Sequence, residues 1–277
     1  MKIYISADIE GVAGVVSPAQ TLQSGFEYEA ARRWMTLELC AACEGAFEAG
    51  AAEIIVSDSH GNGQNLLLDL LPDKVRVVRN WPRPLGMMQG VETDGIAGAF
   101  LLGYHTGAHH QTGVLAHTSA GLLFTEIRLN GAPASETMIS AALAGAFSVP
   151  ILFASGDQPY VVHALDLLGE QISTVETKTP TGRYSADTLT PKAACAKIRQ
   201  AAADAVNNIN TAKPYALEAP IVFEADFQRH LPAELLDYLP CVDRIGSHTI
   251  RHEAPDMIAI SKFLSFITAI QFDEQLP

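Results

Sequence analysis

The amino-acid sequence predicts an α/β fold, a mostly parallel sheet flanked by helices, with a smaller C-terminal α+β domain. Short apolar strand patterns alternate with longer helical patterns through most of the chain, which is the order typical of βαβ units. A polar stretch with two prolines at residues 208–220 is typical of a linker. We therefore expect an α/β domain over residues 1–207 and a smaller domain over residues 208–277.

Local signals mark most elements of the first domain. Ser24 and Glu27 form an S-x-x-E capping pattern before a helical stretch, and Gly50 is a typical helix stop. Asn130-Gly131 is a hairpin signal after the alternating stretch 122–129. We expect strands at residues 2–7, 53–57, 75–78, 98–104 and 149–154. We expect helices at residues 27–49, 64–71, 135–147 and 191–207.

The second domain reads as a strand at 221–227, a helix at 232–238, a strand at 242–252 and a helix at 255–270. The most apolar part of the last helix, residues 257–270, is interrupted by Lys262. It is too short to cross a bilayer and is typical of a core helix. We expect no membrane partner.

Composition excludes several classes of function. The net charge of −13, with no cluster of Lys and Arg, argues against a general nucleic-acid binder. Four cysteines in 277 residues are too few for a disulfide framework, and Cys40 and Cys43 fit a buried helical face better than a redox or zinc site. The first residues do not have the pattern of a signal peptide, so the expected location is cytoplasmic.

Three predicted strands end in side chains that bind metals. Asp8 and Glu10 follow the first strand, His60 follows the second, and His105 follows the strand at 98–104. Because the carboxyl ends of parallel strands meet at one edge of an open sheet, we expect these four side chains to lie close together. Two carboxylates and two imidazoles form a ligand set that zinc prefers, and manganese and cobalt are alternative metals for the same set.

Other polar residues in this half could have either a functional or a structural role. Gly107, Thr112 and Gly113 argue against a helix around His109 and His110, so these two histidines are expected in an exposed loop. His117 either faces the crevice as a proton donor or oxyanion partner or has a structural role. Glu136 is by default a first-turn carboxylate favoured by the helix dipole. Asp58 either orients His60 or makes an Asx turn.

Six motifs extend the comparison beyond single residues. They are D-I-E-G-V-A-G at 8–14, Y-E-A-A-R-R-W-M-T-L-E at 28–38, S-D-S-H-G at 57–61, L-G-Y-H at 102–105, G-V-L-A-H-T at 113–118 and N-G-A-P-A-S-E at 130–136. In order and spacing, these motifs resemble the zinc-dependent D-aminopeptidase family of the dipeptide-transport-operon type, the M55 peptidases. The resemblance covers roughly residues 1–160, and the C-terminal third matches only in outline.

The resemblance implies a site with two zinc ions per subunit. Asp8 would bridge the ions, and Glu10, His60, His105 and Glu136 would complete the ligand set, all from the first domain. His117 matches the family's catalytic histidine. The family also forms ring-stacked homodecamers that enclose the active sites, which would restrict substrates to short peptides, and here the second domain would complete the pocket and the assembly.

The expected function is therefore a zinc-dependent aminopeptidase acting on short peptides or aminoacyl amides, including D-amino-acid peptides. Zinc ions ~3.5–4 Å apart would lower the pKa of a bridging water to ~7, and the activated water would attack the peptide carbonyl. His117 would stabilise the oxyanion or protonate the leaving amine.

Three other functions stay open on the sequence. A zinc amidase or deacylase would use the same site on a non-peptide amide. A magnesium-dependent phosphatase is suggested by Asp8-x-Glu10 after a first strand, although the histidines do not suit a magnesium site. A metal-stabilised oligomer without turnover is the third alternative.

Overall fold

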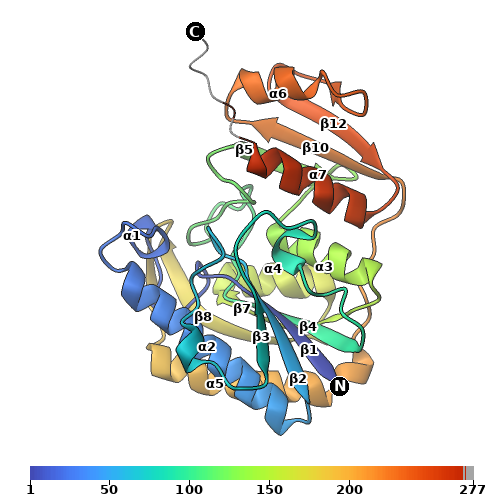
Figure 1. Cartoon of the computed structure of the whole chain (residues 1–277). Coiled ribbons are helices and arrows are strands. Elements are labelled where there is room, and N and C mark those ends of the chain that lie inside the picture. The colour runs from blue at the N-terminus through green and yellow to red at the C-terminus, as the bar shows by residue number, and fades with distance from the viewer. Residues whose placement is uncertain (271, 273–277) are drawn as a thin grey trace.

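The computed structural model describes residues 1–270 and 272, and these residues form two sheets with helices packed between and around them (Figure 1). Among the described residues, sheet A has the strand order β3-β2-β1-β4-β7-β8-β9 and sheet B the order β11-β12-β10-β5-β6. The strands of sheet A are β1 (Lys2–Ala7), β2 (Glu53–Asp58), β3 (Val75–Val78), β4 (Ile96–Leu102), β7 (Ile151–Asp157), β8 (Ser173–Gly182) and β9 (Ser185–Thr188).

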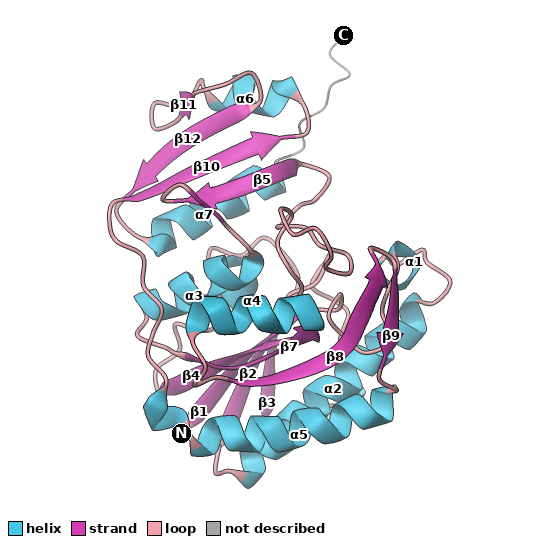
Figure 2. Ribbon diagram, turned by 180° about the vertical axis from the view of Figure 1, so that it is seen from behind, coloured by secondary structure: helices cyan, strands magenta, loops and turns pink. Residues whose placement is uncertain are grey.

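Sheet A is parallel from β3 to β8, and β9 closes it as an antiparallel edge strand. Side chains of β1 alternate between two cores: Ile3 and Ile5 pack with helices α2 (Tyr28–Glu48) and α5 (Pro191–Asn207), while Tyr4 belongs to the other core. Helices α3 (Glu136–Ala146) and α4 (Gln158–Leu168) cover the opposite face of the sheet (Figure 2).

Sheet B is antiparallel and takes strands from two distant parts of the chain. β10 pairs with β12 on one side and with β5 on the other. Helix α7 (Met257–Ala269) lies between this sheet and the α/β layers, with α6 (His230–Leu236) on the far side of the sheet (Figure 2). The strands of sheet B are β5 (Phe124–Leu129), β6 (Ala132–Pro133), β10 (Ile221–Phe227), β11 (Asp243–Arg244) and β12 (Thr249–Ala254).

Short polar side chains start helices α3, α4, α5 and α7. Ser135, Asp157, Thr190 and Asp256 each accept a hydrogen bond from a first-turn backbone N–H, of α3, α4, α5 and α7 respectively. The remaining regular segments are α1 (Pro18–Thr21) and the 3₁₀ turns Leu68–Leu70, Gly86–Met88 and Ile209–Thr211. Among the described residues, no helix has the length and apolar character that crossing a membrane requires.

The expected fold class is confirmed, but three local predictions are wrong. The single strand expected at 242–252 is instead two strands, β11 and β12, separated by residues 245–248. Helix α2 starts at Tyr28 with Glu27 at its N-cap and no side-chain cap, so the Ser24 capping box does not form. The helix expected at 64–71 is reduced to the turn Leu68–Leu70. The Asp58 carboxylate instead accepts the N–H groups of Asn65 and Leu66, which holds this segment as a loop.

The division of the chain at residue 207 stays a prediction. Residues 221–254 supply three strands of sheet B, in the expected second domain, but β5 and β6 of the same sheet come from residues 124–133. The core that contains Tyr4 also continues without a break from sheet A through α3 to α7 and sheet B. The second part of the chain is thus packed directly on the α/β layers.

Candidate functional site

The candidate metal ligands lie at the carboxyl ends of three neighbouring strands. β2, β1 and β4 are adjacent in sheet A, and each is followed within three residues by a predicted ligand: His60, Asp8 and His105 respectively. Glu10 lies two residues after Asp8 in the loop that follows β1. The structure therefore brings these four side chains to one crevice, as the strand pattern predicted.

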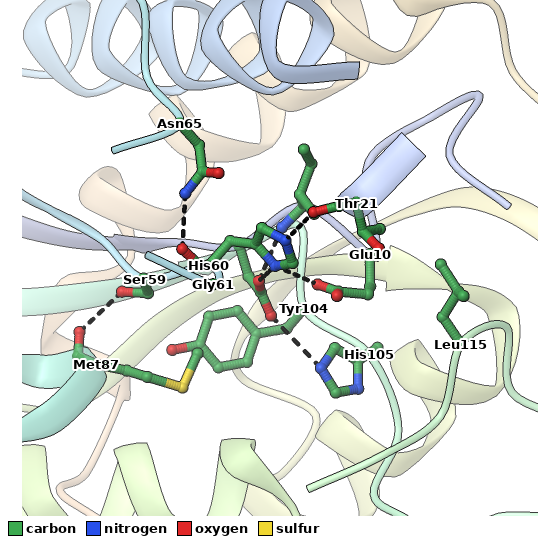
Figure 3. Close-up of polar contacts among 12 residues, drawn as sticks. Glu10, Thr21, Ser59, His60, Gly61, Asn65, Met87, Tyr104, His105 and Leu115 are labelled. Atoms are coloured by element: carbon green, nitrogen blue, oxygen red, sulfur yellow. Dashed lines mark hydrogen bonds and ion pairs between the residues drawn. The ribbon is translucent and has the colours of Figure 1, made fainter. Parts of the chain in front are cut away.

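The first group of side chains is Asp8, Glu10 and His60. His60 Nδ1 lies 3.1 Å from Glu10 Oε2 and 3.3 Å from Asp8 Oδ1. The other ring nitrogen, Nε2, lies 2.8 Å from the backbone carbonyl of Thr21 (Figure 3). Because a carbonyl can only accept, Nε2 carries a proton and Nδ1 is the nitrogen left for a metal ion.

The second group is His105, Glu136 and His117. His105 Nδ1 lies 2.9 Å from the carbonyl of Thr106, while Nε2 lies 3.3 Å from Glu136 Oε2 and 3.5 Å from Asp8 Oδ2. Asp8 thus turns one carboxylate oxygen toward each group. His105 Nε2 is buried and makes no hydrogen bond in the described structure, which is the state of a nitrogen suited to a metal ion.

His117 stacks on His105, with ring centroids 4.1 Å apart and planes at 11°. Its Nδ1 lies 2.9 Å from the carbonyl of Leu115, so Nε2 faces the centre, 3.7 Å from Glu136 Oε1. Unlike His105, the side chain of His117 remains 28% exposed. It therefore lies at the mouth of the centre, where either a metal ion or a substrate can reach it.

The backbone on both sides of His117 is in a strained conformation. Leu115 has φ +56° and Ser119 has φ +60°, values that residues other than glycine rarely adopt. The Leu115 N–H donates to the carbonyl of Arg183, and the Ser119 N–H donates to Glu136 Oε1 over 2.7 Å. These contacts hold His117 against Glu136 and are typical of a positioned functional residue.

Glu136 enters the site from a different direction. It is the first residue of α3, after the β5–β6 hairpin, and its side chain is buried against His105 and His117. No local sequence pattern distinguishes it from an ordinary first-turn carboxylate. Only the family resemblance pointed to it, because the approach of α3 to β4 depends on long-range packing.

Burial and the charges of neighbouring groups shift the pKa values of these side chains in the metal-free protein. Burial opposes the charge on His105, but the Glu136 and Asp8 carboxylates outweigh it and raise its pKa to about 10. The pKa of His60 is raised for the same reason by Glu10 and Asp8. Burial and the neighbouring Glu10 raise the pKa of Asp8 to about 7, whereas His60 holds the pKa of Glu10 well below its usual range despite burial.

Three other residues considered in the sequence lie outside the two groups of candidate ligands. His109 is exposed and His110 is half-buried in a loop, where His110 Nδ1 accepts from the N–H groups of Thr112 and Gly113. Asp58 bonds to Asn65 and Leu66 and so organises the loop after His60 instead of the imidazole. The alternative in which Asp58 orients His60 directly is therefore wrong.

A buried lysine that the sequence pattern did not indicate supports the Glu10 loop. Lys178 Nζ in β8 donates to the backbone carbonyls of Glu10, Val12 and Val15. Lys178 is 2% exposed, and burial lowers its pKa to about 8. Its neighbour two residues earlier, Glu176, is exposed, so strand alternation alone predicts an exposed lysine at this position.

The loops after β1 and β4 also touch through their main chains. The Gly11 N–H donates to the Gly103 carbonyl over 2.7 Å, and a Cβ atom at Gly11 would lie 2.0 Å from the carbonyl oxygen of Tyr104. This contact fixes the Asp8–Glu10 side of the site relative to His105. Asp8, His60, Glu136 and His117 open onto a cavity of about 640 Å³ that residues of α3 and α7 also line.

Comparison with known proteins gives one consistent result. The model of the M55 peptidase family, described as D-aminopeptidase, matches residues 1–266. The D-aminopeptidase of Bacillus subtilis (strain 168) is 28% identical over 273 residues, covering 98% of this chain and 97% of that protein.

A solved structure agrees with this match. The zinc-dependent D-aminopeptidase DppA from Bacillus subtilis, described as a self-compartmentalizing protease, superposes with a TM-score of 0.89 at 27% identity, covering 98% of this chain and all of that chain. The resemblance seen in the six motifs is confirmed over nearly the whole length. This chain belongs to the M55 peptidase family of D-aminopeptidases.

Proposed function

We propose that this protein is a zinc-dependent aminopeptidase that removes the N-terminal residue from short peptides or aminoacyl amides, including those with D-amino acids. The observation that carries the proposal is the meeting of two groups of donor side chains, Asp8, Glu10 and His60 in one and His105, His117 and Glu136 in the other. Asp8, His60, Glu136 and His117 line one cavity. The family relationship supports the same reaction.

Two zinc ions are proposed per subunit, because the donor atoms form two groups. The atoms of Asp8, Glu10 and His60 lie within 4.8 Å of one another, as do those of His105, His117 and Glu136. Asp8 lies between the groups and would be shared. The buried, unbonded Nε2 of His105 and the mixed oxygen and nitrogen donors fit zinc. When bound, zinc would polarise the scissile carbonyl and supply an acidified water.

The protein's own side chains would bind and orient the peptide. A free N-terminal amine is a cation, and the carboxylates at this wall attract it, which favours aminopeptidase over endopeptidase action. His117 has its Nδ1 proton fixed on Leu115, so Nε2 is the atom that would donate a proton to the leaving amine or bond to the oxyanion. We propose this catalytic role for His117 over that of a permanent ligand because its side chain is partly exposed.

The substitution His117→Ala separates these roles. Zinc content should stay at the wild-type level while hydrolysis of dipeptides and aminoacyl amides falls by ~10²–10⁴-fold. His109→Ala, in the exposed part of the same loop, is the matched control and should change neither quantity. Zinc loss in His117→Ala would make His117 a ligand, and unchanged hydrolysis would contradict its catalytic role.

A homodecamer that encloses the active sites is the proposed assembly. The description of DppA as self-compartmentalizing supports it. Light scattering of the zinc-loaded protein should give the mass of ten 29.6-kDa chains, and a monomer or dimer would contradict the proposal. The cytoplasm remains the predicted location.

A further inference from the structure

The cavity beside the candidate ligands has two chemically different walls. One wall holds the carboxylates and imidazoles of Asp8, His60, Glu136 and His117. The remaining walls come from the segment 81–88, from helix α3 and from helix α7. At about 640 Å³, the cavity lies within the range of small-ligand sites. Its second wall therefore has room for a substrate side chain as well as for the reacting atoms.

The side chains of this second wall are largely apolar. Leu85 and Met87 contribute from the segment 81–88, Ile139 and Leu143 from α3, and Leu264 from α7. Burial of apolar surface against such a wall is favourable because it removes that surface from water. A leucine-sized side chain would gain contacts here that glycine or alanine cannot make.

The hydroxyl groups on this wall are bonded within the protein. Ser261 Oγ donates to the carbonyl of Pro84 and Ser265 Oγ to that of Arg83, over 3.1 and 2.7 Å. Thr268 Oγ1 donates to the carbonyl of Leu264 in the same helix. Since these donors already have acceptors, they leave no demand for a polar side chain in the substrate.

Arg83 is the cationic residue among the described side chains that line the cavity, and its charge is directed into the protein. It is 3% exposed, and its guanidinium donates to the carbonyls of Asn80 and Asp58 and to Ser57 Oγ. An anionic substrate side chain would therefore be desolvated on this wall without a free counterion, which is costly.

We propose that this second wall, the surface formed by Leu85, Met87, Ile139, Leu143 and Leu264, is a specificity pocket for a large apolar side chain of the substrate's N-terminal residue. The assignment rests on the proposed aminopeptidase function. The amine and the carbonyl of that residue both lie at the ligand wall during hydrolysis, so its side chain is the first group beyond that wall. Leu264 makes the pocket depend on α7, which comes from the last part of the chain.

The test compares aminoacyl amides that differ only in the first side chain. With the zinc-loaded protein, kcat/KM for leucinamide and phenylalaninamide should exceed that for aspartic acid α-amide by ~100-fold, in the enantiomer that is turned over. Leu264→Lys should reduce this ratio at least tenfold. Phe266→Ala, on the exposed side of the same helix and away from the cavity, should keep the wild-type ratio.

Calorimetric binding of the same amides to zinc-loaded wild-type protein and Leu264→Lys separates this proposal from the proposed function. Preference for leucinamide in binding, lost in Leu264→Lys, supports the pocket even where nothing is hydrolysed, and then only the aminopeptidase assignment fails. Hydrolysis or binding with no preference among these side chains overturns the pocket. A preference that depends on the second residue of dipeptides alone also overturns it.

Discussion

Each of the three histidines in the site uses one ring nitrogen to donate to a backbone carbonyl. His60 donates to Thr21, His105 to Thr106 and His117 to Leu115. The opposite nitrogen of each ring faces the carboxylates, so the main chain selects the tautomer and the ring orientation before a metal ion binds. These carbonyls are set by loop conformation and leave no signature in residue type, so the sequence could indicate the histidines but not their orientation.

A second feature at the residue scale is the buried Lys178. The substitution Lys178→Met removes the donor to the carbonyls of Glu10 and Val15, while the Val12 carbonyl keeps the hydrogen bond from the Val15 N–H. Leaving buried groups unsatisfied costs ~1–3 kcal/mol each, so we expect a loss of about 3 kcal/mol in the free energy of unfolding. Zinc affinity should fall as well, because the loop that carries Glu10 loosens.

Urea unfolding and zinc titration check both effects. Lys197→Met is the matched control, because Lys197 is exposed on α5, and it should behave as wild type. If Lys178→Met retains wild-type zinc affinity, Lys178 does not position Glu10.

At the scale of single elements, the strand ends were the most predictable part of the molecule. Asp8, His60 and His105 each follow a strand whose apolar pattern is evident, and parallel order places these ends together. The segment 64–71 was not predictable from periodicity, because the Asp58 carboxylate competes for the N–H groups that a helix would use. Glu136 was likewise hidden, because its helix reaches the site only through tertiary packing.

Asp157 connects the start of α4 to the loop that carries His117. Its Oδ1 accepts from the Tyr160 N–H in the first turn of α4, and its Oδ2 accepts from the Val114 N–H over 2.7 Å. Asp157→Ala should lower the free energy of unfolding by about 2 kcal/mol, through loss of the cap and of a buried bond. Turnover should also fall with zinc retained, because the chain leading to His117 is released.

The control is Thr190→Ala, which removes the cap of α5, a helix that does not line the cavity. It should lower stability with turnover unchanged, as measured by thermal unfolding and by hydrolysis per bound zinc. Equal turnover in the two variants would show that Asp157 acts only as a helix cap.

At the scale of the whole molecule, the layer order was predictable and the composition of sheet B was not. The pairing of β5 with β10 joins residues about a hundred positions apart, and such contacts leave no local periodicity. The hairpin at Asn130-Gly131 was evident, but its place beside the last strands depends on the shared core of α3, α7 and sheet B. The contribution of α7 to the cavity wall could not be predicted from the sequence for the same reason.

The stability of the metal-free protein should depend on pH through the clustered site. The pKa of Asp8 is raised from 3.8 to about 7 and that of His105 from 6.5 to about 10, so the folded state binds protons more tightly than the unfolded state. The stabilisation of the folded state that these two shifts provide is complete below the unfolded pKa values. It is lost as pH rises toward about 7 for Asp8 and about 10 for His105. Zinc binding requires neutral imidazoles and should therefore release protons near pH 7 and strengthen as pH rises.

Urea unfolding in the presence of a chelator, repeated across this pH range, should show stability falling as pH increases. Calorimetry of zinc binding in buffers of different ionisation enthalpy counts the protons released. Stability that rises with pH, or zinc binding without proton release, would contradict the assignment of charge to His60 and His105 in the metal-free protein.

The contact of Gly11 with Gly103 and Tyr104 limits which sequences can preserve this centre. Every amino acid other than glycine would force a carbon atom into the Tyr104 carbonyl oxygen, and no rotamer relieves a clash at the first side-chain atom. A saturation library at position 11 should therefore return glycine alone among active clones, whereas neighbouring surface positions tolerate variety. Evolution could vary the side chains that line the cavity and select substrates, while the contact between the loops after β1 and β4 stays invariant.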